Sequence, residues 1–298
     1  MLSIVYSESE YWWDVEVLTD ILRGLRTTGS VYFCDFLVPP WELVYKDEAR
    51  AMFHLVRRGR CRIEVEGEVH DLAPGDFVFM APSVDHMMGS DDPDDPQTLL
   101  LCGYCSFDSA EDDILIRALP RFVLLRQDEL EQWPWLTRTL EHLSAEYMSG
   151  APGSELTVNK LTEVLLVQLL RVDFGRSGRE GIVSALRDKR LAAALTNIHE
   201  NPGGAWTIER AAKSASMSRS GFARKFKENL GMAFFDYLTR LRMRNARELL
   251  TTSDLHVGDI GERVGYQSEL SFVKAFKKVH NTTPREFRKQ GSIKETPE

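Results

Sequence analysis

Imidazole and thiol side chains in the N-terminal half of the chain could together bind a metal ion. His54 and His86 stand in or beside apolar runs, and Cys102 and Cys105 lie in the later run TLLLCGYCSF. Nitrogen and sulfur ligands of this kind are typical of zinc and other soft divalent metals. Because the side chains of a strand alternate between its two faces, both thiols could join one site only if Gly103 formed a bulge.

Two other interpretations of these four residues remain open. They could be buried structural side chains, or the two thiols, three residues apart, could form a redox switch. Neither thiol has a visible basic neighbour that would lower its pKa, as reactive thiols usually have.

Polar side chains on a short helix in the C-terminal part could contact a polyanion. Phe222 and Phe226 are four residues apart and would face a core, which leaves the opposite face polar. Guanidinium groups can bridge O6 and N7 of guanine, and ammonium groups neutralise phosphates. The outward side chains are Arg219, Ser220, Arg224 and Lys227. This face predicts contact with a DNA groove.

This helix is the second half of a predicted helix-turn-helix, and the pattern occurs twice. In the first copy Thr207 and Ser218 are expected N-caps, with small alanines at the helix crossing. In the second copy Gly265 makes the turn, because a positive φ costs glycine little, and Ser268 is the cap. Residues 233–253 between the copies predict one long helix with arginines on its outward face. Two copies joined by a basic helix favour nucleic-acid binding over an ordinary solvated surface.

Charge differs sharply between the two parts of the chain. The net charge is -8, but residues 181–298 hold 21 Lys and Arg against 13 Asp and Glu, and residues 1–180 hold 16 against 32. We therefore expect only the C-terminal part to face a polyanion. No apolar run approaches the roughly 18 residues that cross a bilayer, and the first residues show no secretory signal. These features predict a cytoplasmic protein with reduced thiols and no membrane partner.

The apolar periodicity predicts two domains. Short apolar runs between Gly and Pro turns, from about residue 20 to 110, predict an antiparallel barrel or sandwich. The period becomes helical from about 128 to 174, and the second helix there is apolar enough to be buried on its barrel or to form a dimer face. The expected segments are a sensor and dimerisation domain at 1–176, a hinge at 177–185, an all-helical domain at 186–290 and a disordered tail at 291–298.

The C-terminal residues resemble a known family. The motifs IERAAKSASMSRSGFARKFKENLGMAFFDYLTRLRMRNARELL and IGERVGYQSELSFVKAFKKVHNTTPREFR, within about residues 190–290, are similar to the DNA-binding domain of the AraC/XylS transcription regulators. The resemblance implies a seven-helix domain whose two recognition helices enter successive major-groove segments on one DNA face. The departures are minor: Met232 and Ala233, for example, stand where many members have Ser or Thr and Pro.

The resemblance also implies roles for individual side chains. Arginine could read guanine, glutamine adenine and glutamate cytosine, each contact contributing about 1–3 kcal/mol of discrimination. The implied base-contacting residues are Arg219, Ser220 and Arg224 in the first motif and Gln267, Ser268, Glu269 and Ser271 in the second. Phosphate contacts are assigned to Lys227, Arg240, Arg244 and Lys274.

The N-terminal strands resemble the cupin sensor domain common in this family. The cupin frame is present at Gly59, Pro74-Gly75-Asp76, Pro82 and His86. Met52 stands where catalytic cupins carry a metal-binding Glu, which argues against an oxygenase site. The candidate zinc ligands are therefore His54, His86, Cys102 and Cys105. An organic effector in the barrel mouth would be lined by Trp41, Phe53, Phe79 and Tyr104, unless these aromatic side chains belong to the core.

Together these features predict an α+β protein of two domains. A cupin-like antiparallel β-barrel with flanking helices precedes an all-α domain with two helix-turn-helix motifs joined by a long linker helix. We expect a non-enzymatic regulator that binds promoter DNA as a homodimer, contacts RNA polymerase, and senses a small molecule, metal or redox signal. The alternative is a metal-dependent cupin enzyme, or a DNA-alkylation repair protein, fused to a DNA-binding domain.

Overall fold

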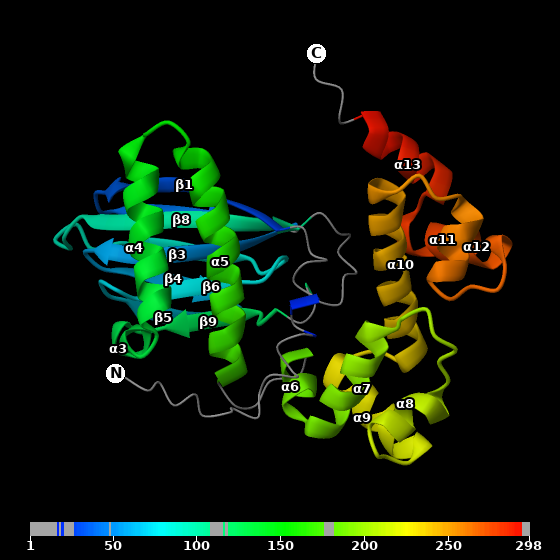
Figure 1. Cartoon of the computed structure of the whole chain (residues 1–298). Helices are drawn as coiled ribbons and strands as arrows, with labels where there is room; N and C mark the ends of the chain where they lie inside the picture. The colour runs from blue at the N-terminus through cyan, green and yellow to red at the C-terminus, as the bar shows by residue number, and fades with distance from the viewer. Residues whose placement is uncertain are drawn as a thin grey trace, which may run out of the picture. The chain divides into compact units, whose positions relative to one another are not determined.

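The computed structural model describes residues 17, 19–20, 27–47, 49–107, 116, 119–175 and 182–293. The chain divides into two compact units (Figure 1). We call residues 25–112 and 119–179 the barrel unit, and residues 1–24, 113–118 and 180–298 the helical unit.

Two antiparallel sheets form the barrel unit, as the alternating apolar runs predict. The five-stranded sheet has the order β1-β8-β3-β6-β9, and the four-stranded sheet has the order β2-β7-β4-β5. The strands are β1 Thr27–Leu37, β2 Trp41–Tyr45, β3 Arg50–Arg58, β4 Cys61–Val65, β5 Glu68–Leu72, β6 Phe77–Met80, β7 His86–Ser90, β8 Thr98–Phe107 and β9 Phe122–Leu125. Glu66 and Gly67, both at positive φ, make the tight turn between β4 and β5.

Two antiparallel helices cover one face of the five-stranded sheet. α4 (Pro134–Ser149) and α5 (Ser154–Gly175) pack on each other and on β1, and lie in front of this sheet in Figure 1. The short α3 (Gln127–Glu131) precedes them. The contact with β1 is close, because a Cβ added to Gly29 would lie 2.2 Å from the Thr162 methyl group. α4 begins at Pro134, a position where the missing backbone N–H costs nothing.

Eight helices make up the described part of the helical unit from residue 182 onward. They are α6 Ile182–Arg187, α7 Lys189–Glu200, α8 Ile208–Ser214, α9 Arg219–Leu230, α10 Phe234–Thr252, α11 Val257–Arg263, α12 Glu269–His280 and α13 Pro284–Ile293. α8 with α9 and α11 with α12 are the two predicted helix-turn-helix motifs, and α10 is the predicted linker. The two-domain α+β architecture is therefore confirmed.

Three details differ from the sequence prediction. β9 pairs with β6 and extends the sheet beyond residue 110, where the pattern placed no strand. α6 begins at Ile182, inside the stretch expected as a hinge, and residues 177–181 lie outside the described residues. α13 continues to Ile293, so the expected tail begins as helix, and residues 294–298 are not described. Short apolar runs such as FVLL and IVSAL carry too little periodicity to identify their type.

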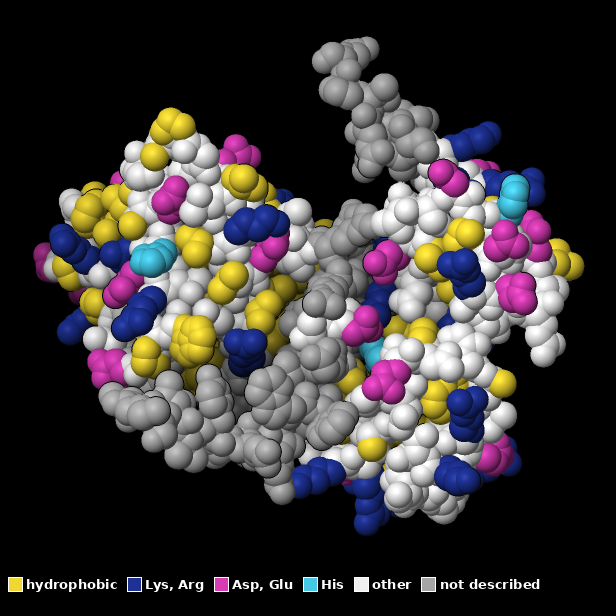
Figure 2. All heavy atoms as spheres, in the orientation of Figure 1, with side chains coloured by type: hydrophobic (Ala, Val, Ile, Leu, Met, Phe, Trp, Pro, Cys, Tyr) yellow, Lys and Arg dark blue, Asp and Glu magenta, His cyan; other side chains and the backbone are white. Residues whose placement is uncertain are grey.

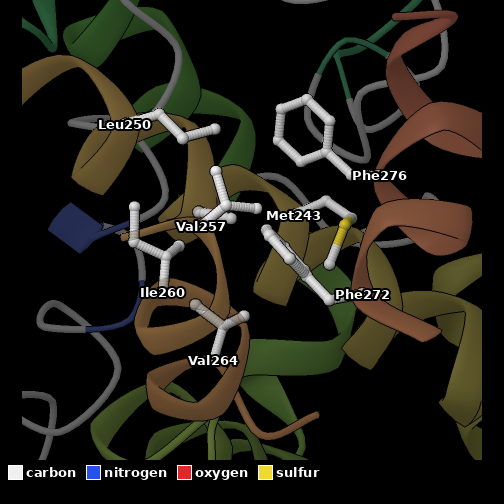
Figure 3. Close-up of a cluster of buried hydrophobic side chains, with 8 residues drawn as sticks. Met243, Leu250, Val257, Ile260, Val264, Phe272 and Phe276 are labelled. Carbon is white, nitrogen blue, oxygen red and sulfur yellow. The ribbon is translucent and has the colours of Figure 1, made fainter. Parts of the chain in front are cut away.

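The second motif is held by one cluster of buried side chains (Figure 3). The cluster is drawn from α10, α11, α12 and the turn between the last two. Its labelled members are Met243, Leu250, Val257, Ile260, Val264, Phe272 and Phe276. A Cβ added to Gly261 would lie 3.1 Å from the Phe272 side chain, so this glycine lets α11 and α12 cross closely. No helix within the described ranges is long and apolar enough to cross a membrane.

Removing the Phe272 ring should destabilise the helical unit. Phe272 has no exposed surface, so Phe272→Ala should cost about 3–5 kcal/mol of unfolding free energy, as expected for a large cavity. Urea unfolding followed by circular dichroism measures this loss. Leu270→Ala is the matched control on the same helix, because Leu270 is 66% exposed and its loss should change stability by less than about 0.5 kcal/mol. Equal costs for both variants would contradict this description of the core.

Candidate nucleic-acid interface and buried imidazole–thiol cluster

The first predicted recognition helix presents a polar face to solvent. The Ser218 hydroxyl accepts a hydrogen bond from the Gly221 amide at 3.2 Å and so caps α9, as expected. Phe222 and Phe226 are fully buried, and both rings contact Phe234 at the start of α10. The expected outward residues Arg219, Ser220, Arg224 and Lys227 are all exposed.

The arginines of this face form weak surface ion pairs. Arg219 lies 3.0 Å from Glu209, and Arg224 lies 3.9 Å from Glu228 in the following turn. Their side chains are 71% and 79% exposed, and ion pairs in such positions typically contribute about 0–1 kcal/mol. Figure 2 shows basic side chains standing out from this unit beside acidic ones. Both guanidinium groups can therefore exchange a carboxylate for a base edge or a phosphate at little cost.

The second predicted recognition helix is exposed at its beginning, but part of its polarity is used internally. The expected contact residues Gln267, Ser268, Glu269, Ser271 and Lys274 are all exposed. The Ser268 hydroxyl accepts a hydrogen bond from the Ser271 amide at 3.3 Å, and the two hydroxyl groups also bond each other. Glu269 lies 3.6 Å from Arg285 of α13. Ser268 is therefore first a helix cap, while Gln267 and Lys274 remain available to an outside partner.

Leu270 is an exposed apolar residue of this helix that was not among the expected contact residues. Its side chain is 66% exposed, whereas Phe272 and Phe276 are buried. The spacing of the two phenylalanines already placed Leu270 on the other face, because residues two apart on a helix point in different directions. An exposed aliphatic side chain at the start of such a helix suits the C5 methyl group of thymine.

The linker helix does not present all of its arginines to solvent. Arg244, expected to contact phosphate, has a side chain only 19% exposed, and its Nη2 lies 2.5 Å from an Asp20 carboxylate oxygen. The same oxygen lies 2.5 Å from His199 Nδ1, and His199 Nε2 lies 2.6 Å from the Tyr237 hydroxyl. Arg240 is partly exposed. In this structure Arg244 therefore belongs to an internal polar cluster.

Charge pairing in this cluster is visible in the pKa of its carboxylate. Burial raises the pKa of Asp20, but the hydrogen bond from His199 and the charge of Arg244 outweigh it and lower the pKa to about 2. Burial lowers the pKa of His199, against the opposing effect of Asp20. The cluster thus holds a carboxylate and a guanidinium with a neutral imidazole between Asp20 and Tyr237 at neutral pH.

Two histidines from opposite sheets meet inside the barrel. His54 of β3 and His86 of β7 place their Nε2 atoms 2.9 Å apart, and both side chains are buried. His86 Nδ1 lies 3.1 Å from the Val84 carbonyl oxygen, which can only accept, so His86 carries its proton on Nδ1. Its Nε2 lone pair then points at His54.

In this arrangement, neither tautomer of His54 gives both of its ring nitrogens a hydrogen-bond partner. If His54 Nε2 donates to His86, its buried Nδ1 is an acceptor with no partner. If its proton is on Nδ1 instead, two lone pairs face each other at 2.9 Å. Burial lowers the pKa of His54 well below its usual value, and burial also lowers the pKa of His86. Neutral imidazole nitrogens are common metal ligands, so this pair could supply two ligands to a cation.

Only one of the two predicted thiol ligands lies beside these histidines. Cys102 of β8 is paired with His54 across the ladder, and its sulfur lies 3.6 Å from the Tyr45 hydroxyl. The pairing of β8 with β3 runs through Gly103 without a shift, and the bulge at this point of the β1–β8 pairing lies in β1, between Val31 and Phe33. Alternation along β8 is therefore kept, and Cys105 faces the other side, toward Glu163 of α5. The four-ligand set is therefore not assembled, and no three His, Cys, Asp or Glu side chains in the described ranges converge closely enough to hold a metal.

The buried thiols are poor nucleophiles in this structure. Burial raises the pKa of Cys102 to about 12, although hydrogen bonds with Tyr45 and Tyr32 oppose the shift. Burial likewise raises the pKa of Cys105 to about 12. Because the thiolate is the reactive form, the geometry disfavours the redox-switch interpretation.

The predicted effector pocket is split by the same strand alternation. Phe53 and Phe79 are paired neighbours on the helix-covered face, with almost no exposed surface. Tyr104 lies on the other face, 6.1 Å from the Tyr32 ring and 4.6 Å from the Arg50 guanidinium carbon. Trp41 is half-buried on β2, and its indole nitrogen is buried with no hydrogen-bond partner. The four aromatic side chains therefore do not line one pocket.

Comparison with known proteins matches both units. A family described as "Cupin" matches residues 16–175, and one described as "Helix-turn-helix domain" matches residues 211–290. An uncharacterized HTH-type transcriptional regulator of Haemophilus influenzae is 30% identical, over 85% of this chain and 91% of that protein. The RCS-specific HTH-type transcriptional activator RclR of Escherichia coli is 29% identical, over 80% of this chain and 84% of that protein.

Similarity to solved structures was also found, over part of this chain. The DNA-binding domain of AdpA in complex with a target DNA is 27% identical, covering 36% of this chain and 94% of that domain with a TM-score of 0.34. The relatives that match most of the chain are named as transcription regulators rather than enzymes. The chain is thus a non-enzymatic DNA-binding regulator of transcription, and it belongs to the AraC family, in the group whose N-terminal domain is a cupin.

Proposed function

We propose that this regulator controls specific promoters in response to a soft divalent metal ion, zinc being the model case, held between the two barrel histidines. The observation that carries the proposal is the pair of imidazole Nε2 atoms 2.9 Å apart, with the tautomer of His86 fixed by the Val84 carbonyl group. A ligating histidine usually donates its other N–H to such a carbonyl, which orients the ring.

The two imidazole nitrogens could hold a small tetrahedral ion after a modest movement. Zinc–nitrogen bonds of about 2.0–2.1 Å require the two Nε2 atoms to be roughly 3.3 Å apart in tetrahedral geometry. The two rings therefore need to separate by only a few tenths of an ångström. Cys102 is the nearest thiol on the same face of the sheet, and a bound cation would favour its thiolate. The metal would supply a cross-link between the two sheets, with no chemical reaction at the site.

Transmission of this signal would involve pairing of two chains and contact with RNA polymerase. The outer face of α5 exposes Leu156 and Val164, at 65% and 46%, which supports a homodimer through this helix. RclR is named an activator. By analogy we propose activation here, with the metal changing how two helical units are presented to one promoter.

An organic effector is the second candidate signal. The buried indole nitrogen of Trp41 has no hydrogen-bond partner, although it is a donor that normally finds one. Trp41 and Tyr45 are alternate residues of β2 and share the face of that strand. A small polar ligand on that face could accept the indole N–H.

Metal binding should depend on the histidines and Cys102 but not on Cys105. Wild-type protein equilibrated with zinc and dialysed should retain about one ion per chain, while His54→Gln, His86→Gln and Cys102→Ser should lose most of it. Elemental analysis of the dialysed proteins measures this, and promoter affinity measured with and without zinc shows whether the ion is a signal. Cys105→Ser is the matched control, since its thiol faces the helices. Equal zinc retention by all five proteins would refute the metal site and leave the organic effector as the candidate.

The two basic side chains of α9 should have different effects on DNA binding. Arg224→Ala should lower affinity for the selected DNA site by about 1–3 kcal/mol and relax the preference at one base pair. Lys227→Ala should weaken binding to all sequences similarly and reduce the salt dependence by about one phosphate contact. Fluorescence anisotropy over a salt series, with single-base variants of the site, separates the two effects. An unchanged base preference in Arg224→Ala would contradict base reading by this residue.

A further inference from the structure

One arginine of the linker helix binds backbone oxygens of two different loops. Arg242 of α10 donates from Nε to the Pro202 carbonyl oxygen and from Nη2 to the Gly204 carbonyl oxygen, both at 2.8 Å. Its Nη1 donates to the Gly265 carbonyl oxygen at 3.2 Å. A guanidinium group carries its donors in one rigid plane, so it holds several acceptors at fixed relative positions.

These acceptors belong to different helix-turn-helix motifs. Pro202 and Gly204 lie in the loop that precedes α8, the first helix of the first motif. Gly265 is in the turn between α11 and α12 of the second motif. Through one side chain, the linker helix therefore fixes the beginning of one motif against the turn of the other.

The two loops are also in direct backbone contact. A Cβ added to Gly203 would lie 2.4 Å from the Arg263 carbonyl oxygen. A Cβ added to Gly265 would lie 2.5 Å from the Gly203 carbonyl oxygen and 2.7 Å from Arg242 Nη2. Gly265 also has a φ of +90°, but Gly203 is required by the close approach alone. This joint, formed by Arg242, Gly203 and Gly265, leaves no room for the loops to move closer.

The loop on the first side of the joint is stiff. The Trp206 indole N–H donates to the Asn201 carbonyl oxygen at 2.7 Å, and the Gly204 amide donates to the same oxygen at 3.1 Å. Trp206 itself is only 8% exposed. On the other side, the Tyr266 ring lies 5.8 Å from the guanidinium carbon of Arg242. A movement of one motif would therefore be passed to the other instead of being absorbed by a loose loop.

We propose that Arg242 is a positioning residue that sets the distance and angle between the two recognition helices, and thereby the number of base pairs that must separate the two DNA segments they contact. Arg242 does this without touching DNA, through the three carbonyl oxygens it holds. The guanidinium group is suited to the task because it remains charged even where burial lowers its pKa, as it does here.

The number of base pairs between the two contacted DNA segments is a sensitive test of how rigid this joint is. One inserted base pair moves the second segment by about 3.4 Å along the duplex and turns it by about a tenth of a helical turn. A rigid pair of motifs cannot follow both changes at once, so one recognition helix loses its base contacts. A pair freed from the joint can follow at least part of the change.

The test uses full-length protein and a duplex selected by the wild type from a random-sequence pool. Base-by-base substitution of this duplex locates the two contacted segments, and further duplexes then carry one base pair more or less between them. Affinities of wild type, Arg242→Gln, Arg242→Lys, Gly203→Ala and Arg210→Gln are measured on each duplex. Thermal unfolding, and binding to duplexes with one segment replaced, report whether each variant is folded and whether each motif still binds.

Wild-type protein should lose about tenfold or more in affinity on insertion of one base pair, the loss expected for broken specific contacts. Arg242→Gln should bind the original duplex about tenfold more weakly, and its spacing penalty should shrink to within about threefold. Gly203→Ala should behave alike, because its Cβ forces the loops apart, and Arg242→Lys should be intermediate. Arg210→Gln is the matched control: Arg210 binds the Ala205 carbonyl oxygen and the Trp206 ring, so it contacts only one of the loops. Arg210→Gln should therefore lose as much affinity as the wild type when one base pair is inserted.

A merely structural role would give a different pattern. Arg242→Gln would then lower the unfolding temperature and the active fraction, but the ratio of affinities for original and altered spacing would equal that of the wild type. This result overturns the proposal, and so does a spacing penalty retained by both Gly203→Ala and Arg242→Lys. If Arg242→Gln does not fold, the latter two variants decide the question.

Discussion

The helical unit depends on the burial of one continuous apolar face of α10 against two aromatic pairs. Phe222 and Phe226 pack at its beginning, and Phe272 and Phe276 pack against Met243 and Leu250 farther along. Each pair fixes the rotation of a recognition helix about its own axis. The exposed faces of α9 and α12 are therefore a consequence of which side of α10 each pair occupies. Burial of this kind is non-directional, so polar contacts such as those of Arg242 must supply the finer alignment.

In the barrel unit, the corresponding constraint is strand alternation in β3 and β8. It places His54 and Cys102 on one face, and Phe53, Gly103 and Cys105 on the other. Cys102 and Cys105 have only two residues between them, yet Cys102 lies in the interior and Cys105 lies under α5. The interior face has the imidazoles and hydroxyl groups, and the helix-covered face is a core of aromatic and aliphatic side chains.

Much of the helical unit could be predicted because its signals are local. The caps Ser218 and Ser268, the turn at Gly265 and the phenylalanine spacing each act within one or two helical turns. A tertiary contact decided the case that failed. Arg244 lies in a basic run, yet it is bound to a carboxylate far away in the sequence.

The same limit applies to the barrel. Alternation correctly separated Cys102 from Cys105, but no local pattern could reveal that β3 and β7, in different sheets, bring His54 and His86 together. Phe53 and Phe79 lie on the face of the sheet that the helices cover. A strand pattern by itself does not tell which face of a sheet is covered by helices. Distances between sheets depend on the packing of the whole unit and are not encoded in any single run.

Asp20 connects the beginning of the chain to the DNA-binding helices. Its carboxylate is synthesised early, and it completes a polar cluster with His199 and Arg244, which are synthesised much later. A fragment that begins at residue 182 would keep the histidine and the guanidinium and lose their shared acceptor. Its linker helix would then present a bare positive charge that the intact chain neutralises. The helical unit as an isolated fragment and the helical unit within the whole protein therefore differ in their electrostatics at the linker helix.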